Sequence, residues 1–130
     1  MPIQVNRIIN APVDRVWNIL TDTHQWLHWG PSVRAVDCAD RFIRKGSCGR
    51  VLTALGFWAP FAITDFDQDH YWSWRVFGIP ATGHKVEVLG MDRCQLIFEV
   101  PFVAAPYATI CKIAMKRIAH QSQGMFVTGS

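Results

Sequence analysis

The spacing of apolar and polar residues changes twice along the chain. The segment IQVNRII near the start alternates like a strand, and the segment NAPVDRVWNILTD that follows has helical spacing. Pro12 suits the first turn of this helix, where its missing N–H is not needed. Apolar residues recur there at i, i+3, i+4 and i+7, as expected of a helix with one buried side: Val13, Val16, Trp17 and Leu20.

Short strands separated by turns are predicted after that helix. THQWLHW predicts a second short helix, ended by Gly30 and Pro31, and turn-forming segments then follow at RKGS, LGFW, DQDH, GIPAT and GMDR. Strands this close together must be antiparallel neighbours. The predicted strands are Val33–Ala39, Gly49–Ala54, Pro60–Phe66, Tyr71–Phe77, Gly83–Leu89 and Cys94–Val100.

The segment AAPYATICKIAMKRIAHQSQ returns to helical spacing, with a polar stripe opposite a broad apolar face. A long amphipathic helix after a sheet of about seven strands should lie across that sheet. We therefore predict one α+β domain over residues 1–130, with an antiparallel sheet, two short helices after the first strand and a long C-terminal helix. Residues 124–130 depart from the helical pattern and are expected to form a disordered tail.

Strand alternation predicts which side chains face the enclosed side. Before residue 70 the alternation leaves two choices, either Phe61 and Ile63 or the residues of opposite parity. In the later strands a hairpin through GMDR that pairs Val88 with Cys94 also pairs His84 with Phe98, so the register is self-consistent. The inward residues after position 70 are then Trp72, Trp74, Val76, His84, Val86, Val88, Cys94, Leu96, Phe98 and Val100.

His84 is the one titratable group on this apolar face. Burial disfavours the charged form and should lower its pKa, which leaves a neutral ring with one donor and one acceptor. Two interpretations stay open. His84 is either a core histidine bonded to a backbone carbonyl or water, or a polar anchor or acid/base for a ligand.

Composition narrows the class of protein. Half of the 130 residues are hydrophobic, and six Trp with eight Phe exceed what a minimal core requires, which hints at a cavity. The net charge of +3 comes without a dense basic stripe, so no nucleic-acid binding is expected. The four cysteines are far apart, with no C-x-x-C pair, and no apolar run reaches the ~20 residues of a membrane span. We expect a cytoplasmic protein whose reduced cysteines are buried small hydrophobes, without stable membrane insertion.

The segment HQWLHWG places His24 and His28 four residues apart, as on one face of a helix. A zinc protease would need a glutamate beside the first histidine, where this chain has Gln25, and nothing nearby identifies a third ligand. We therefore expect no metal and no cofactor. The two histidines are interpreted as polar, with Trp26 and Trp29 on the apolar side, at the rim of a pocket.

The chain also resembles a known family. NAPVDRVWNILTDTHQWLHW resembles the N-terminal signature of the START-related superfamily, and its polyketide cyclase/dehydrase-like branch is the most similar. YWSWRV followed by GHKVEV and a final long helix fits that branch, so the similarity spans residues 3 to 122. The resemblance implies a helix-grip fold, in which a curved sheet holds the long helix and a cavity for an apolar molecule lies between them.

The resemblance, together with the predicted faces, implies the residues of that site. The expected ligand-binding residues are Trp26, Trp29, Phe61, Ile63, Trp72, Trp74, Val76, His84, Val86, Phe98, Ile110, Ile113, Ala114 and Arg117. An enzyme of this family would need a group that moves a proton in the pocket. Glu87 and Glu99 are predicted to face outward, which leaves His84 and Tyr107 as candidates.

Three functions remain open from the sequence. The first is binding or transport of a small hydrophobic ligand, such as a polyketide, lipid or sterol-like molecule. The second is a polyketide cyclase or dehydratase that uses His84 as its acid/base. The third is binding of a protein partner through the apolar turn LGFWAPF, which could instead be a lid, a membrane-touching tip, a contact in a homodimer, or a turn folded onto its own core.

Overall fold

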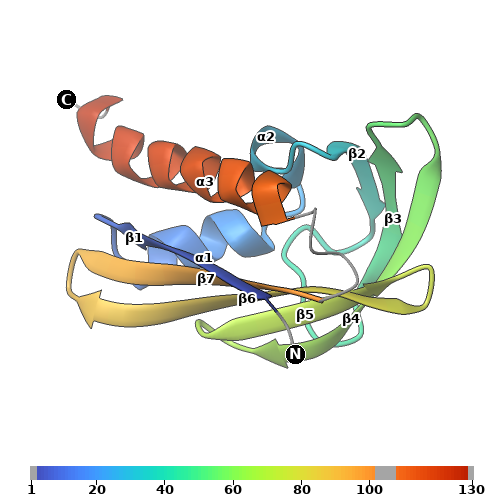
Figure 1. Ribbon diagram of the computed structural model, residues 1–130, viewed down its shortest axis with the longest axis horizontal. Helices are drawn as coiled ribbons and strands as arrows, with labels where there is room; N and C mark the ends of the chain where they lie inside the picture. The colour runs from blue at the N-terminus through green and yellow to red at the C-terminus, as the bar shows by residue number, and fades with distance from the viewer. Residues whose placement is uncertain (1–2, 102–107, 129–130) are drawn as a thin grey trace.

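The computed structural model describes residues 3–101 and 108–128, with side chains in the last helix described from residue 109 to residue 123. It shows the predicted α+β architecture (Figure 1). The elements are β1 (Ile3–Ile9), α1 (Val13–Thr21), α2 (Trp26–Trp29), β2 (Val33–Cys38), β3 (Cys48–Thr53), β4 (Trp58–Asp67), β5 (Tyr71–Val76), β6 (Ile79–Gly90), β7 (Arg93–Val100) and α3 (Ala108–Thr128).

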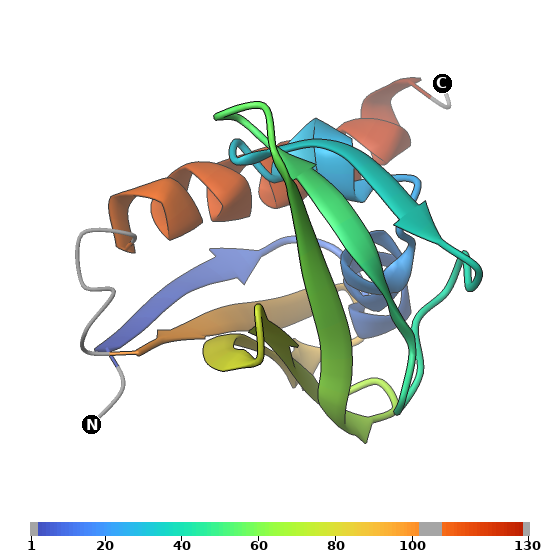
Figure 2. The same ribbon diagram turned by 90° about the vertical axis from the view of Figure 1, so that its right-hand side faces the viewer.

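The seven strands form one antiparallel sheet in the order β1-β7-β6-β5-β4-β3-β2. Each strand from β2 to β7 pairs with its neighbour in sequence, and β1 closes the order by pairing with β7. The sheet curves, so that β2 and β3 rise beside α2 while α3 lies across the concave side (Figures 1 and 2). This is the helix-grip arrangement that the family resemblance implies, and the long helix lies across the sheet as the sequence pattern predicts.

The predicted register of the last hairpin is confirmed. Val88 pairs with Cys94, and His84 pairs with Phe98. Two details differ from the prediction. β6 begins at Ile79, four residues earlier than expected, because Phe77 and Gly78 alone form the turn after β5. Val88 keeps the predicted parity but is 70% exposed, because it lies where β6 extends past the core.

The structure settles which residues face inward before position 70. Phe61 and Ile63 are buried, which decides for the first of the two alternatives that the sequence leaves open. A register shift between Ile63 and Asp65 then reverses the alternation, so that Phe66 also packs against the core. A β-bulge of this kind places two residues opposite one and changes the face of every residue beyond it, which is why simple alternation could not decide.

Both longer helices bury one side, as their spacing predicts. α1 buries Val16, Trp17 and Leu20, and Pro12 is its N-cap, one position before the first helical turn that the sequence suggested. α3 buries Cys111, Ala114, Met115, Ile118 and Ala119. Its backbone continues to Thr128, past residue 124, where the sequence pattern ends.

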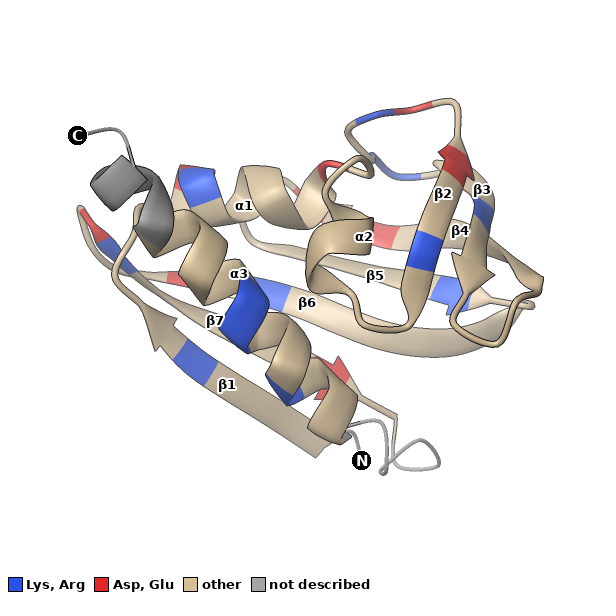
Figure 3. Ribbon diagram, turned by 90° about the horizontal axis from the view of Figure 1, so that it is seen from above, with Lys and Arg blue, Asp and Glu red and all other residues tan. Residues whose placement is uncertain are grey.

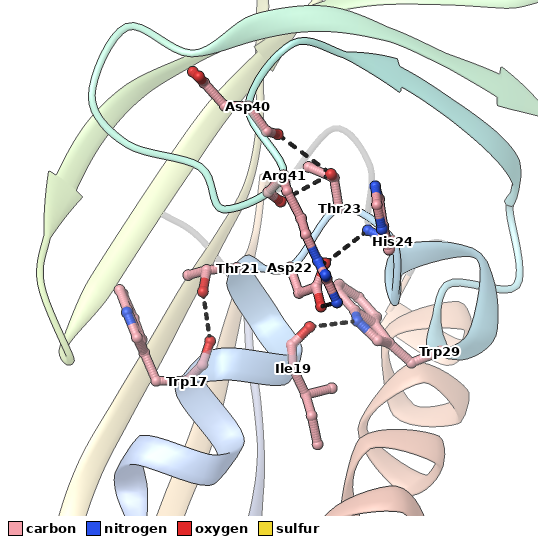
Figure 4. A network of polar contacts seen from close by, with 9 residues as sticks. All are labelled: Trp17, Ile19, Thr21, Asp22, Thr23, His24, Trp29, Asp40 and Arg41. Atoms are coloured by element: carbon pink, nitrogen blue, oxygen red, sulfur yellow. Dashed lines mark hydrogen bonds and ion pairs between the residues drawn. The ribbon is translucent and has the colours of Figure 1, made fainter.

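A polar network fixes the junction of α1 and α2 against the loop between β2 and β3 (Figure 4). Asp22, the C-cap of α1, is 5% exposed and accepts bonds from the backbone N–H of His24 and from Nε and Nη2 of Arg41, each at 3.0 to 3.1 Å. The carboxylate raises the pKa of the Arg41 guanidinium through its hydrogen bond and charge. Because the segment that leads into α2 is held in this way, the short helix begins at a defined position over the sheet.

Candidate ligand-binding cavity

A cavity of about 420 Å³ lies between the sheet, α2 and the first turns of α3. Its size falls within the range of small-molecule sites. Its lining includes no Asp, Glu, Lys or Arg among the described residues. Nine of the residues predicted for a ligand site line it: Trp26, Trp29, Trp72, Trp74, Val76, His84, Phe98, Ile110 and Ala114.

The segment HQWLHWG contributes two of these lining residues, Trp26 and Trp29. The indole N–H of Trp26 donates to the carbonyl of Leu20 at 2.9 Å, and that of Trp29 donates to the carbonyl of Ile19 at 3.1 Å. These carbonyls belong to the last turn of α1, where a helix leaves its acceptors unpaired. Figure 4 shows the bond from Trp29 to Ile19. The polar edges of both indoles are thereby satisfied inside the protein, and their apolar rings remain to line the cavity.

The rings form one continuous aromatic wall. Trp26 lies parallel to Trp72, with ring centroids 5.5 Å apart and an interplanar angle of 8°. Trp72 in turn stacks on His84 at 3.9 Å, and Phe98 meets His84 edge to face at 4.7 Å. Parallel and edge-to-face ring pairs of this kind are favourable beyond their buried area. The result is a stiff aromatic wall on one side of the cavity.

Three polar side chains in this wall are bonded to one another. Nε1 of Trp74 donates to Oγ1 of Thr82 at 3.0 Å, and Oγ1 of Thr82 lies 3.0 Å from Nε2 of His84. Nδ1 of His84 lies 3.3 Å from the carbonyl oxygen of Trp72. A carbonyl can only accept, so Nδ1 of the neutral ring carries the proton and Nε2 accepts from the Thr82 hydroxyl. Both ring nitrogens of His84 are therefore occupied.

The protonation of His84 follows from this environment. His84 is 3% exposed, and burial lowers its pKa from 6.5 to about 3, against a smaller opposing effect of its bond to the Trp72 carbonyl. The ring is thus neutral at physiological pH. As arranged, His84 serves as a fixed polar group rather than a base with a free lone pair.

Thr82 is the site residue that sequence reasoning missed. It lies two positions before His84 on the same strand, so alternation would have placed it inward. The sequence pattern predicts this strand only from Gly83, because the segment GIPAT before it is typical of a turn. β3 and β4 also contribute lining residues that the sequence did not single out: Val51, Thr53 and Ala59.

Five predicted residues lie elsewhere. Phe61, Ile63 and Val86 are buried in the core rather than in the cavity lining, and Phe61 packs against the rings of Trp26 and Trp74. Ile113 is 42% exposed and Arg117 is exposed as well. Because residues of α3 at positions 111, 114, 115 and 118 face inward, positions 113 and 117 lie on the solvent side of the same helix. Tyr107, the other acid/base candidate, lies outside the described residues.

The remaining candidate groups are arranged as follows. Among the described residues no three His, Cys, Asp or Glu side chains gather as a metal site. All four cysteines are unpaired, and the expectation that all are buried is wrong for Cys38, which is half-buried, and Cys48, which is exposed. Burial raises the pKa of Cys94 and of Cys111 to about 11, so both are neutral thiols. No helix in the described part of the chain is long and apolar enough to span a membrane.

Fold and cavity together define a helix-grip domain of the START-related type. A family model described as "Polyketide cyclase / dehydrase and lipid transport" matches residues 2–124, and the chain belongs to that family. No curated protein matches the sequence.

Solved structures share the fold at low sequence identity. The Zhui aromatase/cyclase from Streptomyces sp. R1128 is 12% identical with a TM-score of 0.75, over 97% of this chain and 95% of that one. The di-domain ARO/CYC BexL from the BE-7585A biosynthetic pathway is 11% identical with a TM-score of 0.74, over 97% of this chain and 47% of that one. Protein NE0264 from Nitrosomonas europaea is 12% identical with a TM-score of 0.73, over 98% of this chain and 97% of that one.

Proposed function

We propose that this protein binds and carries a small hydrophobic molecule that contains rings, without transforming it. The observation that carries the proposal is the cavity itself, which is walled by flat aromatic rings and in which Trp74, Thr82 and His84 are hydrogen-bonded to one another. The described lining has no charged side chain, which favours a neutral ligand, since an ion would lose its hydration there without a partner. The four unpaired cysteines fit the reducing cytoplasm, where we expect the protein to act.

A polyketide or sterol-like ring system suits this cavity better than a single acyl chain. The rings of Trp26, Trp72 and His84 stack on one another and form a rigid wall of fixed shape. A rigid ring system loses less conformational freedom on binding against such a wall than a flexible chain would. Two solved structures with this fold are described as aromatase/cyclases, which supports a polyketide-related ligand.

The second candidate function is a cyclase or dehydratase with His84 as acid/base, favoured by the position of His84 in the cavity lining. To take a proton on Nε2, His84 would have to give up its bond to the Thr82 hydroxyl. The ring would also have to carry a charge where burial lowers its pKa to about 3. General bases work best with a pKa near the working pH. These contacts therefore favour a binding role for His84.

Filling the cavity from α3 tests the binding function. Ala114 lines the cavity and is 4% exposed, so Ala114→Phe should occupy its space. Ile113→Phe is the matched control, because the neighbouring side chain is 42% exposed and lies outside the cavity. The probe is N-phenyl-1-naphthylamine, a neutral ring compound whose fluorescence rises when it enters an apolar site. Native mass spectrometry of the wild-type protein, followed by extraction, identifies any molecule that copurifies.

We expect the probe to bind the wild type and the Ile113→Phe variant, and to bind Ala114→Phe at least about tenfold more weakly. Circular dichroism shows whether Ala114→Phe folds. If it does not, Cys111→Leu fills the same cavity with a smaller side chain. Equal probe binding by the wild type and a folded, filled variant would refute the binding function. Conversion of a polyketide substrate that is lost in His84→Gln would instead support the enzyme.

A further inference from the structure

Two hairpin tips present a patch of apolar side chains to solvent, and this patch is called the apolar rim below. It consists of Leu55, Phe57 and Trp58 at the β3–β4 hairpin and Phe77 and Ile79 at the β5–β6 hairpin. Their exposed fractions run from 39% for Trp58 to 85% for Leu55, so this turn is not folded onto its own core. The ring centroids of Phe57 and Phe77 lie 6.2 Å apart, which joins the two tips into one surface.

The backbone of the second tip is strained in a way that exposes an aromatic ring. Phe77 has φ 54° and Gly78 has φ 73°, and Val76 pairs with Ile79 across them. This is a two-residue turn with both central residues left-handed, a turn in which Asn or Gly normally takes the first position. A bulky residue with positive φ is unfavourable, because its Cβ approaches the following carbonyl oxygen. Nothing in the packing of the core requires an aromatic ring there, since Phe77 is 54% exposed.

The rim lies at the entrance of the cavity. Ile79 both lines the cavity and is 64% exposed, so the cavity reaches the surface beside this residue. Thr53 and Ala59, which flank the tip of the β3–β4 hairpin, also line the cavity. Both tips project at the end of the sheet that faces the viewer in Figure 2. A surface that covered the rim would therefore touch the opening through which a ligand enters.

Basic side chains border the rim. The guanidinium of Arg50 lies 4.5 Å from the ring centroid of Trp58, and Nη1 of Arg75 donates to the carbonyl of Gly78 at 3.0 Å, at the tip itself. β2 and β3 each carry one basic residue, Arg34 and Arg50, and a blue segment is visible on each strand in Figure 3. The sequence has no Asp or Glu from Thr53 to Thr64 or from Trp74 to Thr82. Arg50 is also paired with Asp37, whose carboxylate lies 3.0 Å from its Nε, whereas no ion pair of Arg75 is found among the described residues. The region thus combines apolar tips with the positive charge of Arg75.

We propose that the apolar rim docks reversibly on the surface of an anionic lipid bilayer, from which the cavity takes up or releases its ligand. Aromatic and aliphatic side chains enter the boundary between headgroups and acyl chains, while nearby arginines meet anionic headgroups. A second copy of this chain fits less well, because a two-fold contact would bring the same arginines of both copies together. The role in ligand transfer rests on the proposed binding function, whereas the docking itself does not.

Binding to vesicles tests the docking. The vesicles are phosphatidylcholine alone and phosphatidylcholine with phosphatidylserine, and co-sedimentation measures the bound protein. The variant Phe77→Asn removes the ring and supplies a residue that accepts the left-handed turn, so it should fold at least as well as the wild type. Met91→Ser is the matched control, since Met91 is 93% exposed at the β6–β7 hairpin and does not line the cavity.

We expect the wild type and Met91→Ser to bind vesicles that contain phosphatidylserine, and Phe77→Asn to bind about tenfold more weakly, as for the loss of one buried aromatic ring. Arg75→Gln should weaken binding to these vesicles more than Arg93→Gln, a control at the far hairpin. Equal binding to both kinds of vesicle, or an unchanged Phe77→Asn, would overturn the proposal. So would a dimer in solution that Phe77→Asn dissociates. Vesicle binding that persists in Ala114→Phe would separate this surface from the cavity.

Discussion

Acidification should lower the free energy of unfolding, and the contribution of His84 to this loss can be calculated. The ring is buried and its pKa is lowered from 6.5 to about 3. In the unfolded chain the same ring takes up a proton as the pH falls below 6.5. Between these two values the unfolded state binds more protons than the folded state, so stability falls with the pH. His84 has its full stabilising effect above pH 6.5 and loses it progressively toward pH 3.

The loss of stability at pH 5 depends little on the pKa of His84 in the folded state. There the folded ring is still neutral, whereas the unfolded ring is almost fully protonated. The difference of about 1.5 pH units from the unfolded pKa corresponds to a loss of about 2 kcal/mol relative to pH 7.5. In urea this should lower the midpoint of unfolding by about 1 M.

The assay compares urea unfolding of the wild type and His84→Gln at pH 7.5, 6 and 5. Glutamine keeps a donor and an acceptor but does not titrate, so the difference between the two proteins isolates His84 from every other group. We expect the wild type to lose about 2 kcal/mol more than the variant between pH 7.5 and pH 5. The NMR signals of the His84 ring should stay in their neutral position over the same range.

Identical pH dependence in the two proteins, with a His84 ring that protonates near pH 6.5 in the folded state, would refute this reasoning. A ring that titrates there would have a lone pair available to a substrate. The same result would therefore favour the cyclase or dehydratase over the carrier. If His84→Gln does not fold, the NMR titration of the wild type decides alone.

Three further changes have expected outcomes. Thr82→Val should lower the free energy of unfolding by about 2 kcal/mol, because its two ring partners lose their hydrogen bonds, whereas Thr82→Ser should lose less than half of that in the same urea titration. Asp22→Asn should lower the melting temperature more than Asp37→Asn, since Asp22 is buried beneath its exposed partner Arg41, whereas both members of the Asp37–Arg50 pair are exposed. Gly49→Ala should cost about 2–3 kcal/mol by thermal unfolding, because the new Cβ would clash with a backbone carbonyl that cannot move aside. Equal effects within either pair, or a stable Gly49→Ala protein, would contradict the contacts described.

The sequence by itself determined the order of the elements, the antiparallel sheet and the register of the last hairpin. These follow from periodicity, which is a local property: a period of two or of 3.6 residues is set by the backbone geometry of each element. The pairing of His84 with Phe98 could be predicted because the turn at GMDR is short and both strands alternate strictly. The tryptophans of HQWLHWG could be assigned to the cavity because they lie on the apolar side of a short helix that the family resemblance places beside it.

Only the tertiary structure decided which side chains of the site are hydrogen-bonded to one another and which face the cavity. Thr82 joins Trp74 to His84 because β6 begins earlier than the turn residues suggested, and Ile113 and Arg117 face solvent because α3 rotates other residues inward. The bulge in β4 decided which residues of that strand face inward after Ile63. Each outcome depends on which side chains meet across elements that are distant in sequence. Burial and side-chain hydrogen bonds depend on these contacts between elements, so they cannot be deduced from a local sequence pattern.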